Sequence, residues 1–186
     1  MIGWRSLEVL LVTGLLAGAP ALAQSVTVPE PENYQMQDYH SPVPATLKGV
    51  TVVHDEAAHA LWEKGEVAFV DVVPRPPKPA NLPAGTIWRE KPRHSIPGAI
   101  WLPNVGYGDI APQTAAYFRR GLEKATGGDR SHPVLLFCLA DCWMSWNAAK
   151  RAVEYGYTTV YWYPEGTDGW TFFDWPTEVV TREPGE

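Results

Sequence analysis

The sequence predicts an α/β domain with a central, mostly parallel sheet and helices on both faces. Two segments, residues 66–73 (EVAFVDVV) and 133–138 (PVLLFC), are nearly continuous apolar runs. Such runs are typical of strands that are buried on both faces, as in parallel sheets. Segments in which apolar residues follow a helical spacing alternate with these runs, and this alternation is the pattern of α/β proteins.

The first half of the domain gives four expected elements. A short apolar run at 50–53 precedes a helix that starts at Asp55, a favoured capping residue, and ends at Gly65. The strand at 66–73 follows. Residues 74–93 carry five prolines in their first ten positions, which precludes a helix or a central strand there. We expect this stretch to be a long loop or an insertion.

The second half repeats the alternation of strand and helix. A Pro-Gly turn at 97–98 introduces a short strand, and a proline favours a helix start near residue 112. We expect strands at residues 100–102, 133–138 and 158–163, the second of them buried on both faces. We expect helices at residues 112–127 and 145–155, between these strands.

The N-terminus has the pattern of a cleaved signal peptide over residues 1–23. A basic start leads into an apolar stretch, and Ala21-Leu22-Ala23 has the small-x-small form of a cleavage site. The stretch is short for a bilayer core of about 30 Å, which takes ~20 residues. We therefore expect cleavage after Ala23 and a periplasmic protein without a membrane segment, with an uncleaved anchor as the alternative.

The mature chain is expected to have three parts. Residues 24–47 form an extended lead-in that Tyr34 and Tyr39 hold against the domain, 48–176 form the domain, and 177–186 form a C-terminal tail. The net charge of −6 at pH 7 argues against nucleic acid as a partner. An exported protein enters an oxidising compartment, where two cysteines can become a disulfide.

Cys138 and Cys142 are the only cysteines, and they lie four positions apart in the stretch FCLADCWMSW. Cys138 ends a buried strand, and ligands of open α/β sheets bind beyond the carboxyl ends of strands. Loop amides and the start of the following helix should lower the pKa of the Cys138 thiol and favour its thiolate. The loop is therefore the main functional signal.

Four segments in order resemble the rhodanese-like domain family: VAFVDVV, HSIPGAIWLP, PVLLFC and NAAKRAVEYGYTTVYWYPEGTDGW. The resemblance covers about residues 48–175 and implies the rhodanese-like fold. It also places Cys138 at the position of the family's nucleophile, which takes up a sulfane sulfur as a persulfide and passes it to an acceptor.

The loop departs from the typical family pattern Cys-Arg-x-Gly-x-Arg. Both arginines are absent, and Asp141 adds a negative charge. An anionic donor such as thiosulfate thereby loses two charge-assisted contacts, each worth ~1.5–3 kcal/mol. The Cys-x-x-x-Cys-Trp loop resembles more closely an exported subgroup associated with alcohol oxidation that depends on pyrroloquinoline quinone (PQQ). This resemblance implies a quinoprotein dehydrogenase system or a periplasmic thiol partner.

Two thiols in one loop indicate a thiol redox or sulfur carrier, acting as a sulfurtransferase or a thiol–disulfide oxidoreductase. Cys138 is then the nucleophile that carries a persulfide, and Cys142 resolves it to a disulfide. Three alternatives stay open: a binding or accessory protein with a structural disulfide, a buried and inert Cys142, and a copper carrier, since thiolates suit Cu(I). We assign no metal ligand.

The remaining candidates surround the cysteines or could support them. Trp143 and Trp146 form an aromatic wall for a quinone or a partner, or simply pack in the core. Asp71 interacts with the loop or orients His94, or else bonds to nearby backbone, and His94 makes a structural hydrogen bond. The basic side chains of 74–93 supply cations to the loop or stay solvated. The candidate loop residues are Leu139, Ala140, Asp141, Trp143, Met144, Ser145 and Trp146.

Overall fold

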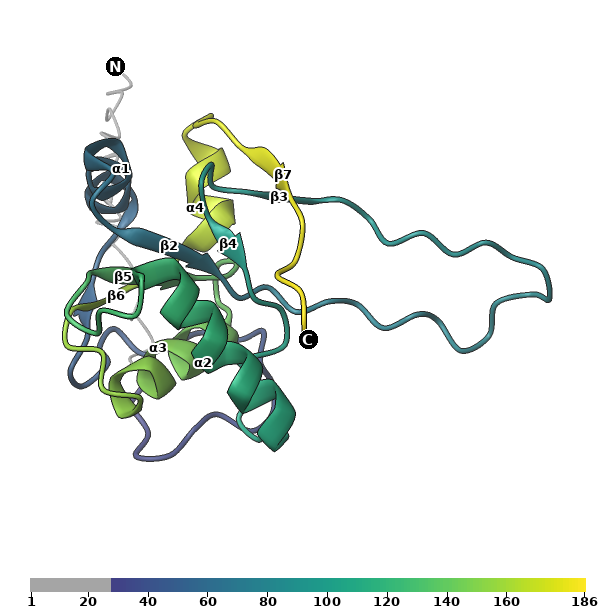
Figure 1. Ribbon diagram of the computed structural model, residues 1–186, viewed down its shortest axis with the longest axis horizontal. Coiled ribbons are helices and arrows are strands. Elements are labelled where there is room, and N and C mark those ends of the chain that lie inside the picture. Colours follow the sequence, from purple (N-terminus) through teal and green to yellow (C-terminus); the bar gives the residue numbers. More distant parts are fainter. Residues whose placement is uncertain (1–27) are drawn as a thin grey trace, which may run out of the picture.

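The central feature of the computed structural model is a five-stranded parallel sheet with the strand order β1-β6-β5-β2-β4 (Figure 1). The structure describes residues 28–186, so the expected signal peptide lies outside the described residues. The strands are β1 (Thr51–Val52), β2 (Ala68–Asp71), β4 (Ile100–Trp101), β5 (Val134–Phe137) and β6 (Val160–Tyr163). The helices are α1 (Asp55–Lys64), α2 (Pro112–Thr126), α3 (Trp143–Glu154) and α4 (Gly166–Phe172).

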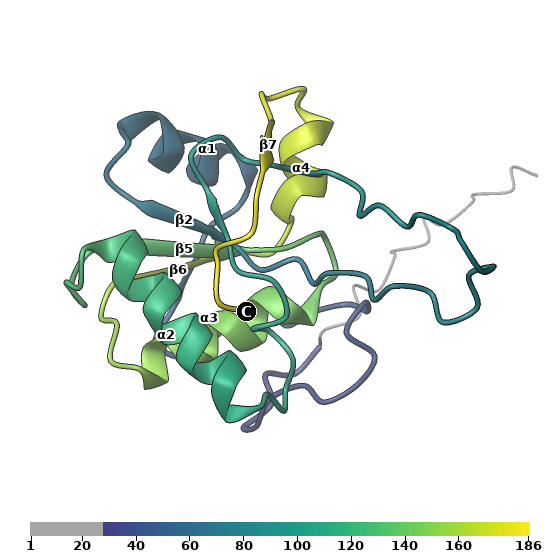
Figure 2. The ribbon, with the colours of Figure 1, turned by 45° about the vertical axis from the view of Figure 1, so that its right-hand side comes forward.

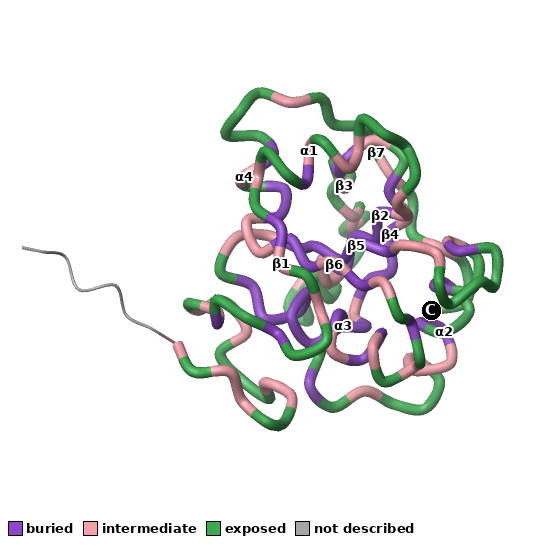
Figure 3. The backbone as a smooth tube through the Cα atoms, turned by 90° about the vertical axis from the view of Figure 1, so that its left-hand side faces the viewer, coloured by how far each residue is buried: buried purple, intermediate pink, exposed green. Residues whose placement is uncertain are grey.

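Different helices cover the two faces of the sheet. Along β5, Val134 and Leu136 pack in a core with α2 and α3, whereas Leu135 and Phe137 pack with α1 and α4 (Figure 2). Successive side chains of a strand point to opposite faces, so one apolar run serves both cores. The alternation continues into Cys138, which joins the core on the side of α2 and α3. The α/β class and the parallel sheet are confirmed, and Figure 3 shows the buried strands at the centre.

A second sheet of two antiparallel strands lies beside the first. It pairs β3 (Arg93–Ser95) with β7 (Glu178–Val180), which belongs to the segment expected to be a tail. The chain end is also attached to the body, because Tyr117 donates a hydrogen bond to the carbonyl of Glu183. Residues 177–186 are therefore part of the folded domain.

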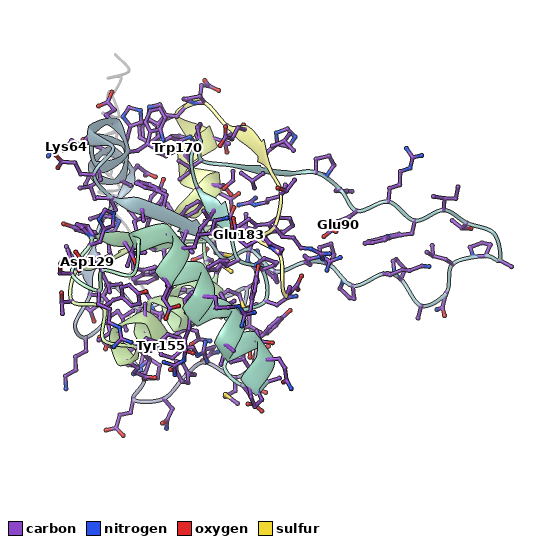
Figure 4. All side chains as sticks on the ribbon, viewed as in Figure 1. Lys64, Glu90, Asp129, Tyr155, Trp170 and Glu183 are labelled. Carbon is purple, nitrogen blue, oxygen red and sulfur yellow. The ribbon has the colours of Figure 1, made fainter. Side chains whose placement is uncertain are left out.

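The proline-rich stretch is a long loop that projects from the body (Figure 1). At its base, the Arg75 guanidinium lies 2.7 Å from a carboxylate oxygen of Glu90 and 3.1 Å from one of Glu186. Glu90 is labelled in Figure 4 on the projecting loop, near this base. In the part of the chain that the structure describes, no helix is long and apolar enough to cross a membrane.

The segment 34–47, which we call the strap, lies along α3. The Arg151 guanidinium is 4.2 Å from the centre of the Tyr34 ring, and the Asn147 side chain exchanges two hydrogen bonds with the backbone of Gln35. Further along, the Trp146 indole donates to the carbonyl of Thr46. The expected lead-in is thus a bound segment.

Replacing Arg151 with leucine should destabilise the fold strongly. Arg151 is 4% exposed and donates hydrogen bonds to the carbonyls of Val105, Tyr107 and Gly108 at 2.8–3.1 Å. The variant leaves three buried acceptors without a donor, at ~1 kcal/mol or more each, so we expect a loss of about 3 kcal/mol in urea unfolding. The control is Lys150→Leu, one position away on a less buried site; an Arg151→Leu variant as stable as this control would contradict the assignment.

Candidate functional site

The cysteine pair lies where β5 ends and α3 begins. Cys138 directly follows β5, and Cys142 is the N-cap residue of α3. Both are free thiols, and their Sγ atoms are 2.7 Å apart. A disulfide bond is about 2.0 Å long, so only a small movement separates this contact from a bond. The structure therefore brings the two candidate residues together in one site.

The two thiols are buried to different degrees. Cys138 is 0% exposed and Cys142 is 6% exposed. Burial in an apolar environment disfavours the charged form of a thiol, whereas amides at a helix start stabilise it. The first effect acts most strongly on Cys138, and the second acts on Cys142 because it caps the helix.

The structure corrects the expectation that Cys138 is the favoured thiolate. Burial raises the pKa of Cys138 well above its ordinary value, and the contact with Cys142 and the charge of Asp71 raise it further. The hydrogen bond from Cys138 lowers the pKa of Cys142 to about 7, against the effect of burial. Backbone amides assist in lowering the pKa of Cys142; they belong to Met144, Leu139 and Ser145.

The reason for this reversal is the start of α3. The sequence predicted a helix from about Ser145, but the helix begins at Trp143, so Cys142 becomes its cap. The first amides of a helix have no partner within the helix and point outward from its N-terminus. They therefore stabilise negative charge on the second sulfur of the loop.

The other loop candidates are structural in this arrangement. Trp143 and Trp146 are 4% and 0% exposed, so they pack in the core and do not form an open aromatic wall. Met144 and Ser145 are buried as well, and the Ser145 hydroxyl donates to the carbonyl of Cys142 at 3.1 Å. These four residues fix the helix start against the sheet.

The tip of the loop is more accessible. Leu139 and Ala140 are half-buried, and Asp141 is exposed with φ +50°, in the left-handed region. The amide of Ala140 donates to the Asp168 carboxylate at 3.0 Å. The loop thus has a fixed tip that presents one carboxylate to solvent.

The start of α4 holds the loop on its other side. The Thr167 amide donates to the carbonyl of Cys138 at 3.0 Å. Gly166 precedes it with φ +54°, and a Cβ atom there would lie 2.2 Å from the same carbonyl oxygen. Only glycine permits this approach of backbone to backbone.

Asp71 is connected to the loop, but through Arg93 and not through His94. The Asp71 carboxylate accepts hydrogen bonds from Arg93 at 2.7 Å and from Ser95 at 2.6 Å. Arg93 also donates to the Thr167 hydroxyl at 3.1 Å. His94 is exposed and alternates with these two residues along β3, so it does not support the site.

Sequence reasoning missed Ser95 and Thr167, included Arg93 only among the basic residues of 74–93, and expected the lead-in against the domain without its contact with Cys142. The alternation of side chains along a strand indicates that Arg93 and Ser95 share a face and that His94 points elsewhere. The position of Thr167 and of the strap depends on tertiary packing, for which the sequence holds no local signal. The basic residues Arg75 and Arg93 form ion pairs with Glu90 and Asp71 respectively.

A hollow of about 510 Å³ lies beside the loop. Its described lining contains the carboxylates of Asp141 and Glu165 but no lysine or arginine. His54 approaches Glu165 at 2.7 Å. This environment repels an anion such as thiosulfate. Among residues 28–186, no group of three or more His, Cys, Asp or Glu side chains is arranged to hold a metal ion.

Comparison with known proteins gives one family and several solved structures. A family model described as "Rhodanese-like domain" matches residues 54–172. A polysulfide-sulfur transferase homodimer from Wolinella succinogenes has 21% identity and a TM-score of 0.44, covering 70% of this chain and 79% of its own. An uncharacterized protein from Saccharomyces cerevisiae has 20% identity and a TM-score of 0.41, covering 67% and 92% respectively. No curated protein that was compared matches the chain.

Replacing Gly166 with alanine should disturb the loop more than a similar change elsewhere. The new Cβ would collide with the Cys138 carbonyl, and the residue would also lose its freedom at positive φ. Gly98 has φ +80° and nothing within 4 Å of an added Cβ, so Gly98→Ala carries only the backbone cost of ~1–2 kcal/mol. In urea unfolding Gly166→Ala should lose clearly more; equal losses would show that the loop is not held here.

The alkylation of Cys142 by iodoacetamide should titrate with a midpoint near pH 7. Only the thiolate reacts, so the rate falls below this pH as Cys142 takes up a proton and reaches a plateau above it. Mass spectrometry of digested protein identifies the labelled residue. The chain unfolded in urea is the control, with an ordinary midpoint of about 8.5. A native midpoint at the unfolded value would contradict the lowered pKa.

Proposed function

The chain belongs to the rhodanese-like domain family, and from this we propose that it is a thiol redox or sulfur carrier that works through Cys142 and Cys138. One observation carries the proposal: two free thiols lie 2.7 Å apart, and one of them has a pKa of about 7. A pair of this kind is poised to form and open a disulfide, because attack needs a thiolate and a neighbouring sulfur.

We assign the attacking role to Cys142 and the resolving role to Cys138, the reverse of the roles that the family position of Cys138 implies. Cys142 has the lower pKa, is the more exposed of the two and is the N-cap residue of α3. A resolving thiol reacts only inside the protein, so full burial does not hinder it. A persulfide would accordingly form on Cys142.

The redox reaction then has two steps. The Cys142 thiolate attacks one sulfur of a partner disulfide, forms a mixed disulfide and releases the first partner thiolate. The Cys138 sulfur next attacks Cys142, and the thiol proton passes to the departing second partner thiolate. The partner disulfide is reduced to two thiols, and the two cysteines are oxidised to one disulfide.

Sulfur transfer uses the same first attack. The Cys142 thiolate takes the outer sulfur of a persulfide donor and releases the donor thiolate. An acceptor thiolate can remove that sulfur again, which regenerates the Cys142 thiolate. Alternatively Cys138 attacks the inner sulfur, which releases hydrosulfide and leaves the disulfide. The carboxylates of Asp141 and Glu165 near the loop disfavour thiosulfate as the donor.

We also propose a periplasmic setting and a role in PQQ-dependent alcohol oxidation, with a quinoprotein dehydrogenase system or a periplasmic thiol protein as partner. The support for the location is the cleavage pattern that ends at Ala23. The support for the partner is the resemblance of the Cys-x-x-x-Cys-Trp loop to the exported subgroup.

A second candidate function is a non-enzymatic accessory protein in which a Cys138–Cys142 disulfide only fixes the loop. The complete burial of Cys138 favours this alternative, because a buried disulfide resists reduction. The two candidates differ in the ease with which the pair exchanges with small thiols and disulfides.

Serine variants of the two cysteines should separate the roles. With oxidised glutathione at pH 7, Cys138→Ser should accumulate a glutathione adduct on Cys142, because the resolving thiol is missing. Cys142→Ser should react at least ~10-fold more slowly, because Cys138 is almost fully protonated at this pH. Intact-mass measurements over time report both adducts.

The wild-type chain is the reference and should form an internal disulfide, two mass units lighter, that dithiothreitol reverses. An adduct that forms faster on Cys138 than on Cys142 would return the attacking role to Cys138. A wild-type disulfide that withstands dithiothreitol in the folded protein would favour the accessory function.

A further inference from the structure

The strap covers the cysteine pair at its residues 39–41. His40 forms an isolated antiparallel bridge with Cys142, and the Trp143 amide donates to the carbonyl of Tyr39 at 2.9 Å. The Trp143 indole donates to the Ser41 hydroxyl at 3.0 Å. The Trp143 amide is one of the first amides of α3, which have no partner within the helix. The strap therefore provides a hydrogen-bond acceptor for a free amide at the helix start, next to the sulfurs.

The strap follows one face of α3. Its contacts fall on Trp143, Asn147 and Arg151, which are four residues apart and so share one side of the helix. Tyr39 adds an edge contact with Tyr107, with ring centres 5.2 Å apart, and its hydroxyl accepts a hydrogen bond from the backbone. Polar contacts and ring edges make up most of this attachment.

The strap contributes few side chains to the core. Within residues 34–47, all of which the structure describes, only Pro44 and Leu47 are buried. Segments with little buried apolar surface open locally at a lower free energy than the whole fold. Residues 34–42 can thus leave α3 while the core around β5 stays folded.

Residues 43–45 of the strap, next to the residues that contact the site, border a hollow beside the loop. Val43, Pro44 and Ala45 line the hollow of about 510 Å³ together with Ala140 and Asp141 of the loop. The chain therefore touches the site at 39–41 and leaves space beside it at 43–45. Such a space lets the closed part move without a clash with the loop.

We propose that the strap is a gate, and that residues 39–41 lift from Cys142 and Trp143 before any reagent or partner reaches the sulfurs. With the strap closed, the two cysteines are 0% and 6% exposed, which leaves no room for the approach to a sulfur atom. The gate regulates the site of the proposed function and in that sense rests on it. The thiols then react only in the open state, which forms spontaneously or is induced by a partner.

The test compares two events in the reduced full-length chain. The first is hydrogen exchange of the Trp143 amide, which the strap protects directly. The second is labelling of Cys142 by iodoacetamide at pH 8. After the labelling rates are corrected for the thiolate fraction at pH 8, a gate predicts that both are slowed by the same factor relative to the unfolded chain. This factor should be smaller than that of core amides such as Leu136.

A strap variant with a matched control sharpens the test. Tyr39→Ala removes the ring that rests on Tyr107, and we expect both exchange and labelling to become about tenfold faster, as for the loss of ~1.4 kcal/mol of contact energy. Tyr161→Ala removes a half-buried tyrosine that packs against the other core, and it should leave both rates unchanged. Ser41→Ala, which removes only the bond to the Trp143 indole, serves if Tyr39→Ala does not fold.

Two results would overturn the gate. Labelling that is as slow as exchange in the core would mean that the pair reacts only after global unfolding. Labelling at the rate of a free thiol, with the Trp143 amide still protected, would mean that the closed strap does not limit access. Neither result involves a redox partner, so the gate and the proposed function can fail separately. If the strap opens but the protein does not react with glutathione, only the proposed function is contradicted.

Discussion

The hydrogen bond between the two thiols is the interaction on which the account of the site depends. It joins a sulfur at the end of β5 to a sulfur at the start of α3, 2.7 Å apart. Its direction follows from position: Cys138 is enclosed by the core and keeps its proton, and Cys142 faces helix amides and loses its proton first. The same contact that makes one thiol acidic places the other for a bond, so a single geometry serves both steps of the proposed disulfide cycle.

The surrounding structure holds this contact through a chain of three linked residues on one side and through the strap on another. The start of α4 holds the Cys138 carbonyl through Thr167, and Arg93 links Thr167 to the buried carboxylate of Asp71. The strap closes the other side. A buried ion pair such as Asp71–Arg93 contributes little net stability, because desolvation of the charges offsets their attraction. We therefore assign it the role of positioning Thr167 against the cysteine loop. Rigid support of this kind suits a site whose chemistry depends on less than 1 Å of sulfur movement.

The sequence predicted the fold class well, because buried runs and helical spacing are local signals. The alternation along residues 134–138 places Cys138 on the same side as Val134 and Leu136, and the end of that strand marks the site. The prediction that Cys138 is the more acidic thiol was wrong because acidity depends on where α3 begins. A start at Ser145 would leave both cysteines outside the cap, whereas the observed start at Trp143 makes Cys142 the cap. The lead-in was expected against the domain, but its position over Cys142, the strand β7 and the contact at Gly166 join residues far apart in the chain, so no local pattern could indicate them.

The most direct measurement of this account is the absorbance of the thiolate near 240 nm as a function of pH in the Cys138→Ala variant and in the reduced wild type. The variant keeps Cys142 at its helix and removes the donor that lies 2.7 Å away. The account predicts that wild-type Cys142 titrates near pH 7 and that the variant titrates at a distinctly higher pH. Identical titrations would contradict it, because they would show that the Cys138 thiol does not lower the pKa of Cys142.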